Sequence, residues 1–162
     1  MDEILVDENG YKQYLDVLEK LKQKSLLNAS VGSEACSDAV GDGWHDNFAF
    51  EETMRESRAI AARIDKMLNE KKHLKIVEPI ELGDEFINIG DSFQVKLKYD
   101  IDDVEIEQLT LTGKYKPNTD LIIKEISLNS PIGKAVYKQK VNSTISYYAN
   151  GNKIEITILN KI

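Results

Sequence analysis

Two aspartates, Asp42 and Asp46, have the type and spacing best suited to chemistry in this sequence. Carboxylates exposed to solvent stay ionised near neutral pH. Their hard oxygen atoms suit Mg²⁺, which keeps several waters and is commonly shared with the phosphates of a substrate. Two carboxylates alone make an open Mg²⁺ site. They become useful when another macromolecule already holds one metal ion, because two-metal phosphoryl chemistry needs ligands for a second.

The charge around these aspartates is one-sided. From Ser25 to Met54 there is no Lys or Arg. The carboxylates of the same stretch are Glu34, Asp38, Asp42, Asp46, Glu51 and Glu52. A cation, or a site supplied by a partner, would relieve their repulsion. A purely structural interpretation stays open, because Asp46 is also a suitable N-cap, and its charge would favour the dipole of a following helix.

The residues between the two aspartates allow more than one role. His45 could ligate a metal, but a single histidine beside a tryptophan is more often a packing or surface residue. Trp44 could pack across the turn or insert into a partner. The sequence contains no Ser-His-Asp or Cys-His nucleophile set, no glycine-rich phosphate loop and no pair of histidines at ligand spacing. We therefore do not expect a self-contained active site.

Two long helices must position the acidic turn. The first proline is Pro79, so the preceding residues permit long helices. Apolar residues at 11, 14, 15, 18 and 21 have helical spacing. After the turn, apolar or small residues recur in alternating steps of four and three, as in a coiled-coil seam. The expected seam residues are Phe50, Met54, Ser57, Ala61, Ile64 and Leu68. Two such helices form an antiparallel hairpin roughly 45 Å long, with the aspartates at its far end.

The composition changes after Pro79 to short runs typical of strands. The ranges 92–99 and 104–112 alternate as half-buried strands do, whereas 121–126 is more fully apolar and suggests a central strand. Ser130 suits an N-cap and Pro131 the first helical position. Asn150-Gly151 predicts a hairpin turn. We predict an α+β protein: residues 1–76 form an antiparallel coiled-coil hairpin with its acidic tip at 41–47, and residues 80–162 form a small antiparallel sheet with one short helix.

Composition excludes several classes of protein. The 162 residues carry a net charge of −7, which argues against wrapping a nucleic-acid backbone unaided. Cys36 is the only cysteine, so there is no internal disulfide, and a reducing cytoplasm fits. No segment resembles a signal peptide or reaches the roughly 18 apolar residues of a membrane span. We expect a cytoplasmic protein.

Three stretches resemble the bacterial Gre transcript cleavage factors, GreA and GreB. The Gre loop G-D-x-x-E-N resembles Gly41-Asp42 followed by Asp46-Asn47, with one additional residue and Asp in place of Glu. The segment 61–65 is similar to the G-R-I segment of that family. The stretch ISLNSPIGKAVYKQKV at 126–141 resembles the C-terminal signature I-S-x-x-S-P-[IL]-G-x-A-L-x-G-K-x-V.

This resemblance implies a specific function. Gre factors insert the coiled-coil hairpin into the secondary channel of RNA polymerase, and their C-terminal domain, which resembles an FKBP fold, docks on the channel rim. Asp42 and Asp46 would help to hold a second Mg²⁺ beside the polymerase's own aspartates, so that the polymerase cuts the 3′ end of backtracked nascent RNA. The Mg²⁺ would be shared with the polymerase. The protein would be an accessory factor in transcription elongation. It would also be DNA-binding and a monomer.

The resemblance also assigns roles to individual residues. Asp42 matches the first tip acid of the family and Asp46 takes the place of its Glu. The residues expected to support the tip are Trp44, His45, Asn47 and Phe50. The residues expected to dock on the polymerase are Ser130, Pro131 and Ile132. The Arg found early in the second helix of the family falls on Met54 here, which makes Arg55 and Arg58 the candidates for RNA contact.

Two other functions compete with cleavage stimulation. A Gre-like regulator could occupy the same channel and inhibit or modulate the polymerase without cleavage, and the altered loop is its hint. A prolyl isomerase or peptide-binding module would instead need an open aromatic pocket. The tyrosines that could line such a pocket are Tyr99, Tyr115, Tyr137, Tyr147 and Tyr148, although isolated strand tyrosines more often pack on a sheet face.

Overall fold

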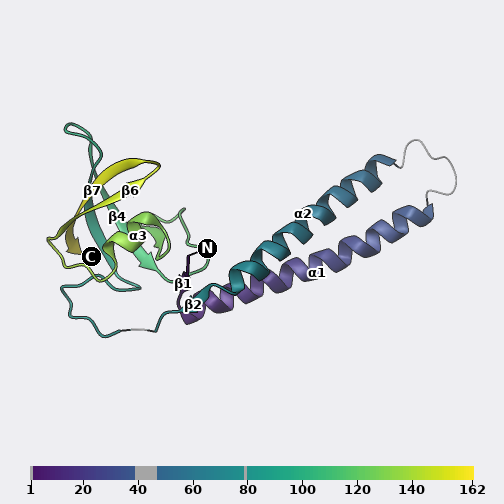
Figure 1. Ribbon diagram of the computed structural model, residues 1–162, viewed down its shortest axis with the longest axis horizontal. Coiled ribbons are helices and arrows are strands. Elements are labelled where there is room, and N and C mark those ends of the chain that lie inside the picture. The colour runs from purple at the N-terminus through teal and green to yellow at the C-terminus, as the bar shows by residue number, and fades with distance from the viewer. Residues whose placement is uncertain (1, 39–46, 79) are drawn as a thin grey trace. The chain divides into compact units, whose positions relative to one another are not determined.

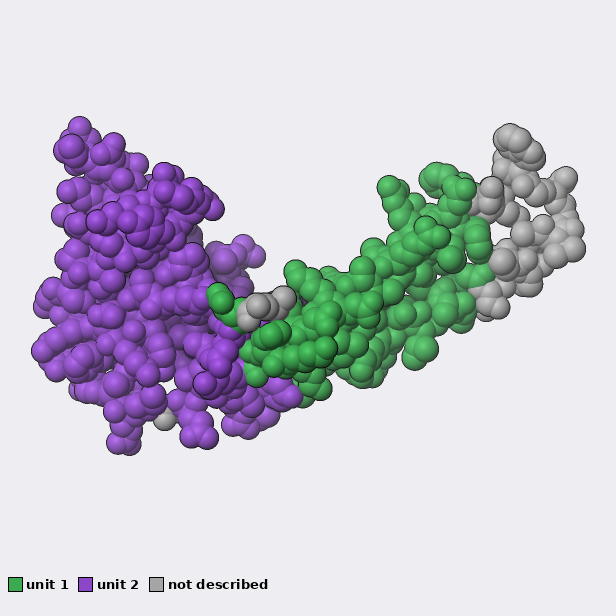
Figure 2. All heavy atoms as spheres, in the orientation of Figure 1, with its two compact units in different colours: residues 1–2, 14–74 green, residues 3–13, 75–162 purple. Residues whose placement is uncertain are grey.

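The computed structural model describes residues 2–38, 47–78 and 80–162, with only the backbone described at 33–38 and 47. The chain divides into two compact units (Figure 2). Residues 14–74 make up nearly all of the first unit, and residues 3–13 and 75–162 make up the second. No helix in the described ranges is long and apolar enough to cross a membrane.

The first unit is a helical hairpin, as predicted. Helix α1 spans Glu8–Asp38 and helix α2 spans Asn47–Lys71, and the two run side by side (Figure 1). Two cross-helix contacts establish the antiparallel direction. The Tyr14 hydroxyl donates to the carbonyl of Met67. Farther along the arm, Lys24 Nζ lies 2.7 Å from Glu56 Oε1. Hydrogen bonding from Lys24 holds the pKa of the Glu56 carboxyl below its ordinary value.

The predicted seam on α2 is wrong at every second position. The inward residues are Phe50, Thr53, Ser57, Ile60, Ile64 and Met67. Met54, Ala61 and Leu68, which we expected in the seam, are exposed. Both patterns share three residues and both suit a helix of 3.6 residues per turn, so spacing does not choose between them. The observed seam buries Ile60 where the predicted seam would bury only an alanine side chain.

The seam on α1 changes character along its length. Near the start of the unit, Tyr14 and Leu18 are buried. In the second half, the residues that turn partly inward are Ser25, Asn28 and Gly32. Nearby apolar side chains there, Leu26, Leu27 and Val31, are exposed to solvent. The hydrophobic stabilisation of the hairpin therefore comes mainly from its first half, because exposed leucines add little.

The second unit contains a five-stranded sheet in the order β5-β4-β3-β7-β6. Its strands are β3 (Ser92–Lys98), β4 (Val104–Thr112), β5 (Lys124–Ser127), β6 (Thr144–Ala149) and β7 (Asn152–Lys161), with helix α3 (Pro131–Val136) after β5. Neighbouring strands are antiparallel except β4 and β5, which are parallel. The predicted turn at Asn150-Gly151 is confirmed, with positive φ at both residues.

Two features of the second unit differ from the sequence prediction. The strand expected at 121–126 begins only at Lys124, and it lies at the edge of the sheet instead of its centre. Ile122 is 99% exposed. An apolar run alone does not distinguish a buried strand from an exposed turn. We also missed a two-stranded sheet formed by β1 (Ile4–Val6) and β2 (Leu74–Ile76), because three-residue strands carry too little periodicity.

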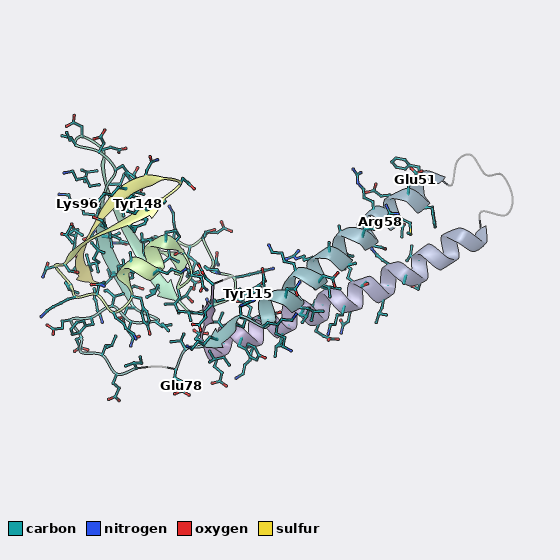
Figure 3. All side chains as sticks on the ribbon, viewed as in Figure 1. Glu51, Arg58, Glu78, Lys96, Tyr115 and Tyr148 are labelled. Atoms are coloured by element: carbon teal, nitrogen blue, oxygen red, sulfur yellow. The ribbon has the colours of Figure 1, made fainter. Side chains whose placement is uncertain are left out.

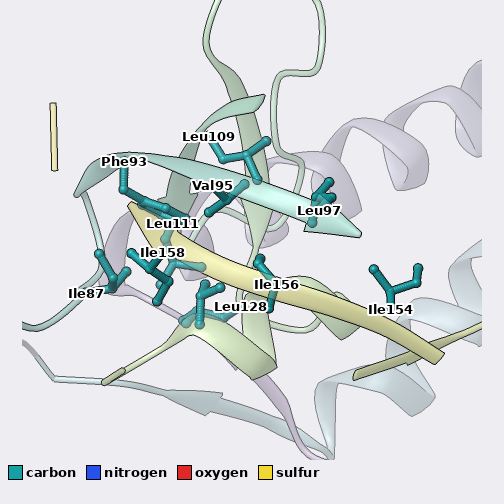
Figure 4. Packing of buried hydrophobic residues seen from close by; sticks show 11 residues of the cluster. Ile87, Phe93, Val95, Leu97, Leu109, Leu111, Leu128, Ile154, Ile156 and Ile158 are labelled. Carbon is teal, nitrogen blue, oxygen red and sulfur yellow. The ribbon is translucent and has the colours of Figure 1, made fainter. Parts of the chain in front are cut away.

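One face of the large sheet carries the core (Figure 4). The buried cluster consists of Ile87, Phe93, Val95, Leu97, Leu109, Leu111, Leu128, Val136, Ile154, Ile156 and Ile158. On β3, β4 and β7 these residues recur at every second position, so one face of each strand points inward. Leu128 and Val136 bring the end of β5 and helix α3 into the same cluster.

The position of the hairpin seam can be tested by two alanine substitutions. Ile60→Ala should lower the free energy of unfolding by about 2–4 kcal/mol, because it leaves a cavity at a buried position. Leu68→Ala, at a position that is 40% exposed, should cost roughly 0.5 kcal/mol or less. Urea titrations followed by circular dichroism at 222 nm would measure both changes. A larger loss from Leu68→Ala would favour the seam expected from spacing.

Glu125 predicts an acid-sensitive contribution to stability. Its carboxylate accepts hydrogen bonds from Lys114 Nζ at 2.6 Å and from the Asn118 backbone N–H at 2.8 Å. The Lys114 hydrogen bond is the main cause that holds the pKa of Glu125 below its ordinary value. A lowered folded pKa stabilises the protein above the unfolded pKa, and this gain is lost as the pH falls through the folded value.

Glu125→Gln should therefore flatten the acid side of the stability curve. Wild type should lose more stability than the variant between about pH 5 and pH 3. Thermal melts across this pH range would measure the difference. Glu155→Gln is the control, because Glu155 is exposed on β7. Parallel curves for wild type and Glu125→Gln would contradict the assignment.

Candidate functional site

The predicted acidic tip lies outside the described residues. Asp42, Trp44, His45 and Asp46 belong to the segment that the structure does not describe, so their roles stay predictions. The backbone of Asn47 begins α2. Among residues 2–38, 47–78 and 80–162, no group of three or more His, Cys, Asp or Glu residues could hold a metal ion.

The first turns of α2 form the described surface next to this segment. Phe50 is half-buried in the seam, whereas Phe48 is 76% exposed. A shallow hollow here is lined by Phe48, Phe50, Glu51, Glu52, Met54, Arg55 and Arg58. Arg55 and Arg58 are both exposed and, three residues apart, lie on neighbouring positions of the helix surface. Figure 3 shows Arg58 and Glu51 on this helix.

The ion pair that Arg55 makes with Glu52 is weak. The Arg55 guanidinium lies 4.0 Å from the Glu52 carboxylate, with both side chains largely exposed. An exposed pair at this distance contributes little stability. Within the described part of the chain the Arg55 side chain is therefore held only weakly, and the assignment of Arg55 and Arg58 to RNA stays a prediction.

The second predicted site is the start of α3, and here the structure confirms the local prediction. Ser130 is the N-cap: its hydroxyl accepts a hydrogen bond from the Gly133 N–H at 3.0 Å and donates to the Ser127 carbonyl at 2.7 Å. Pro131 occupies the first turn and is exposed. Ile132 is half-buried against the core. The Ser130 hydroxyl is thus engaged internally, and Pro131 is the most exposed of the three residues, whose docking role stays a prediction.

Two further residues, Gly133 and Asn129, shape this segment. An added Cβ at Gly133 would overlap the carbonyl oxygen of Ser127, so the backbone approach excludes any larger residue. Asn129 exchanges two hydrogen bonds with the backbone of Leu5, each 2.7 Å long. A glycine inside a helix is the sequence signal for the first. Nothing in the sequence points to the second.

The tyrosines considered for a peptide-binding pocket have different environments. Tyr147 and Tyr148 are consecutive on β6, so their side chains point to opposite faces of the sheet. Tyr147 packs against the core, whereas Tyr148 is exposed (Figure 3). Burial raises the pKa of the Tyr137 phenol, which packs on the core cluster. The FKBP-like character of this unit stays a prediction.

Comparisons with known proteins match both units. Residues 87–160 match the family described as "Transcription elongation factor, GreA/GreB, C-term". The transcription elongation factor GreA of Thermosipho africanus is 25% identical over 158 residues, covering 98% of this chain and 96% of the relative. GreA of Caldanaerobacter subterraneus is 25% identical over 156 residues, covering 96% and 95%. The solved structure of GreA factor homolog 1 (Gfh1) from Thermus thermophilus is 22% identical over 99% of each chain, with a TM-score of 0.43.

The same substitution should have opposite effects at two glycines. Gly133→Ala should destabilise the second unit by about 1–3 kcal/mol, because the methyl group would overlap the Ser127 carbonyl. Gly32→Ala should stabilise the hairpin by roughly 0.5–1 kcal/mol, since its Cβ would lie 3.8 Å from Thr53 Cγ2 and alanine favours a helix. Chemical denaturation of each variant would measure the change. Tolerance of alanine at 133 would refute the close approach.

Proposed function

We propose that this chain, whose residues 87–160 match the GreA/GreB C-terminal family and which is similar to GreA along nearly its whole length, is a transcription elongation factor that enters the secondary channel of RNA polymerase and stimulates cleavage of the 3′ end of backtracked RNA. The chain would be an accessory factor, with the bond broken in the active site of the polymerase. Residues 130–132 would dock on the rim of the channel, and the helical hairpin would carry the acidic residues between α1 and α2.

The observation that carries this proposal is the hairpin. Its two helices contact each other through Tyr14 and Met67 and, farther along the arm, through Lys24 and Glu56. At about 1.5 Å per residue, the 31 residues of α1 extend roughly 46 Å. Its outer half exposes apolar side chains instead of burying them. A long arm with a weakly packed outer half suits contact with a partner better than it suits stabilisation of the chain itself.

The sequence between the helices supports a metal-sharing role. Asp42 and Asp46 lie in the sequence between Asp38 of α1 and Asn47 of α2. Their hard carboxylate oxygens suit Mg²⁺, and no Lys or Arg from Ser25 to Met54 competes for them. A Mg²⁺ shared with the polymerase would supply Lewis-acid chemistry for cleavage of a phosphodiester. We assign Asp42 and Asp46 as its ligands from this chain.

The exposed arginines suit a contact with the RNA. Arg55 and Arg58 follow the start of α2 by two to three turns, both are exposed, and the ion pair of Arg55 with Glu52 is long, at 4.0 Å. A guanidinium binds phosphate oxygens through paired hydrogen bonds. Their place on α2 would orient the RNA 3′ end relative to the aspartates.

A second function is favoured by the altered connection. Compared with the Gre loop, the segment 41–47 has one additional residue, and the Asp46 side chain is one methylene shorter than that of Glu. Catalytic groups tolerate only small displacements. The alternative is therefore a regulator that occupies the channel and slows nucleotide addition without stimulating cleavage.

A transcript-cleavage assay separates the two functions. Purified protein added to halted, backtracked elongation complexes should shorten the RNA, and Asp42→Asn or Asp46→Asn should reduce the cleavage rate by about 10²-fold, because each removes a charged metal ligand. Glu51→Gln, which changes an exposed carboxylate on α2, is the matched control and should leave the rate within about two-fold.

Binding must be measured beside cleavage. Both aspartate variants should bind RNA polymerase as tightly as wild type, because the docking segment is unchanged. Binding of wild type without cleavage, together with slower nucleotide addition, would establish the regulator instead. Equal cleavage by wild type and both aspartate variants would refute the metal-sharing role.

A further inference from the structure

We propose that Asn129, held by the N-terminal strand β1, is a positioning residue for the docking segment, defined as residues 130–132. The first residues of the chain would thereby set the affinity of a surface more than a hundred positions away in the sequence. The inference rests on the proposed function in one respect, namely that the docking segment binds RNA polymerase.

The side chain of Asn129 acts as a strand partner for Leu5. Its Nδ2 donates to the Leu5 carbonyl and its Oδ1 accepts from the Leu5 N–H, with both distances 2.7 Å. Two residues of neighbouring antiparallel strands exchange backbone hydrogen bonds in the same way. The paired bonds fix both the position and the plane of the amide, which a single bond would leave free to rotate.

The backbone at Asn129 and Ser130 is also held by hydrogen bonds to Ser127. The Asn129 N–H donates to Ser127 Oγ at 3.1 Å. The Ser130 N–H and hydroxyl both donate to the Ser127 carbonyl, at 3.1 and 2.7 Å. Gly133 packs so closely on that carbonyl that a Cβ would overlap it. Any shift of Asn129 must therefore move Ser130 and the exposed Pro131 that follows.

Strand β1 is a fixed support that does not depend on Asn129. Val6 is fully buried, and its carbonyl accepts a hydrogen bond from the Val77 N–H at 2.8 Å. The Asp7 N–H donates to the Gly113 carbonyl at 3.0 Å. Loss of the Asn129 side chain should consequently leave β1 in place and loosen the docking segment, which would then be held only through its bonds to Ser127. This expectation makes the role separable from folding.

The alternative is that Asn129 merely satisfies the backbone of Leu5. A matched control separates the two roles. Ser92 Oγ and Thr110 Oγ1 lie 2.7 Å apart and link β3 to β4 in the same unit. Ser92→Ala removes this hydrogen bond and should lower thermal stability without touching residues 127–133. If positioning matters, affinity will fall for Asn129 variants and not for this control at a comparable loss of stability.

The test measures the Kd for core RNA polymerase and the melting temperature of each full-length variant. Asn129→Leu should raise the Kd about 10-fold, because the docking segment must then be ordered on binding. Asn129→Asp keeps the acceptor for the Leu5 N–H and loses the donor. Its Kd should lie between those of wild type and Asn129→Leu. Ser92→Ala should change the Kd less than two-fold. Should Asn129→Leu fail to fold, the Asn129→Asp variant decides the question.

A local measurement and one further variant complete the experiment. Hydrogen exchange at the Gly133 and Lys134 amides, which Ser130 bonds in the folded protein, should accelerate in Asn129→Leu and not in Ser92→Ala. Pro131→Glu places a charge on the docking segment and should abolish binding. An unchanged Kd for Pro131→Glu would refute docking through these residues. A different result would overturn only the positioning role: Pro131→Glu weakens binding to RNA polymerase, but Asn129→Leu binds with the same Kd as Ser92→Ala.

Discussion

Burial of one face of the five-stranded sheet is the constraint on which the second unit depends. Phe93, Val95 and Leu97 on β3 face the same cluster as the inward residues of β4 and β7. Leu128 belongs to this cluster as well. Leu128 is buried, and the chain turns directly after it. Asn129 and Ser130 are therefore half-buried at the edge of the core. The most exposed residue of the docking segment, Pro131, is thus placed by a buried neighbour three positions earlier.

The two halves of the hairpin are packed differently. Its first half buries Tyr14, Leu18, Ile60 and Met67, as an ordinary helix pair does. Its second half turns small and polar residues toward the partner helix and leaves leucines outside. Helices of this length gain most of their stability from tertiary packing rather than from propensity. The outer half therefore relies on contacts such as the Lys24–Glu56 ion pair and on continuity with the better-packed half.

The two units support one proposed function by separate means. The C-terminal match to GreA/GreB and the start of α3 bear on docking. The hairpin and the run without basic residues bear on delivery of carboxylates to a partner's active site. Neither unit holds a group of acidic or metal-binding side chains within its described residues that could act alone. In the proposed function the chemistry is shared, with the polymerase supplying the other ligands and the substrate.

The sequence by itself determined what depends on neighbours in the chain. Helical spacing predicted α1 and α2, alternation predicted β3 and β4, and Ser130-Pro131 and Asn150-Gly151 predicted a cap and a turn, because each signal acts within a few residues. Tertiary structure alone decided which adjacent positions, Ile60 or Ala61, enter the seam, since both satisfy the same helical period. It also decided the edge position of β5 and the bond between Leu5 and Asn129, which are 124 positions apart. Residues so far apart produce no periodic pattern in the sequence, since only the folded core brings them together.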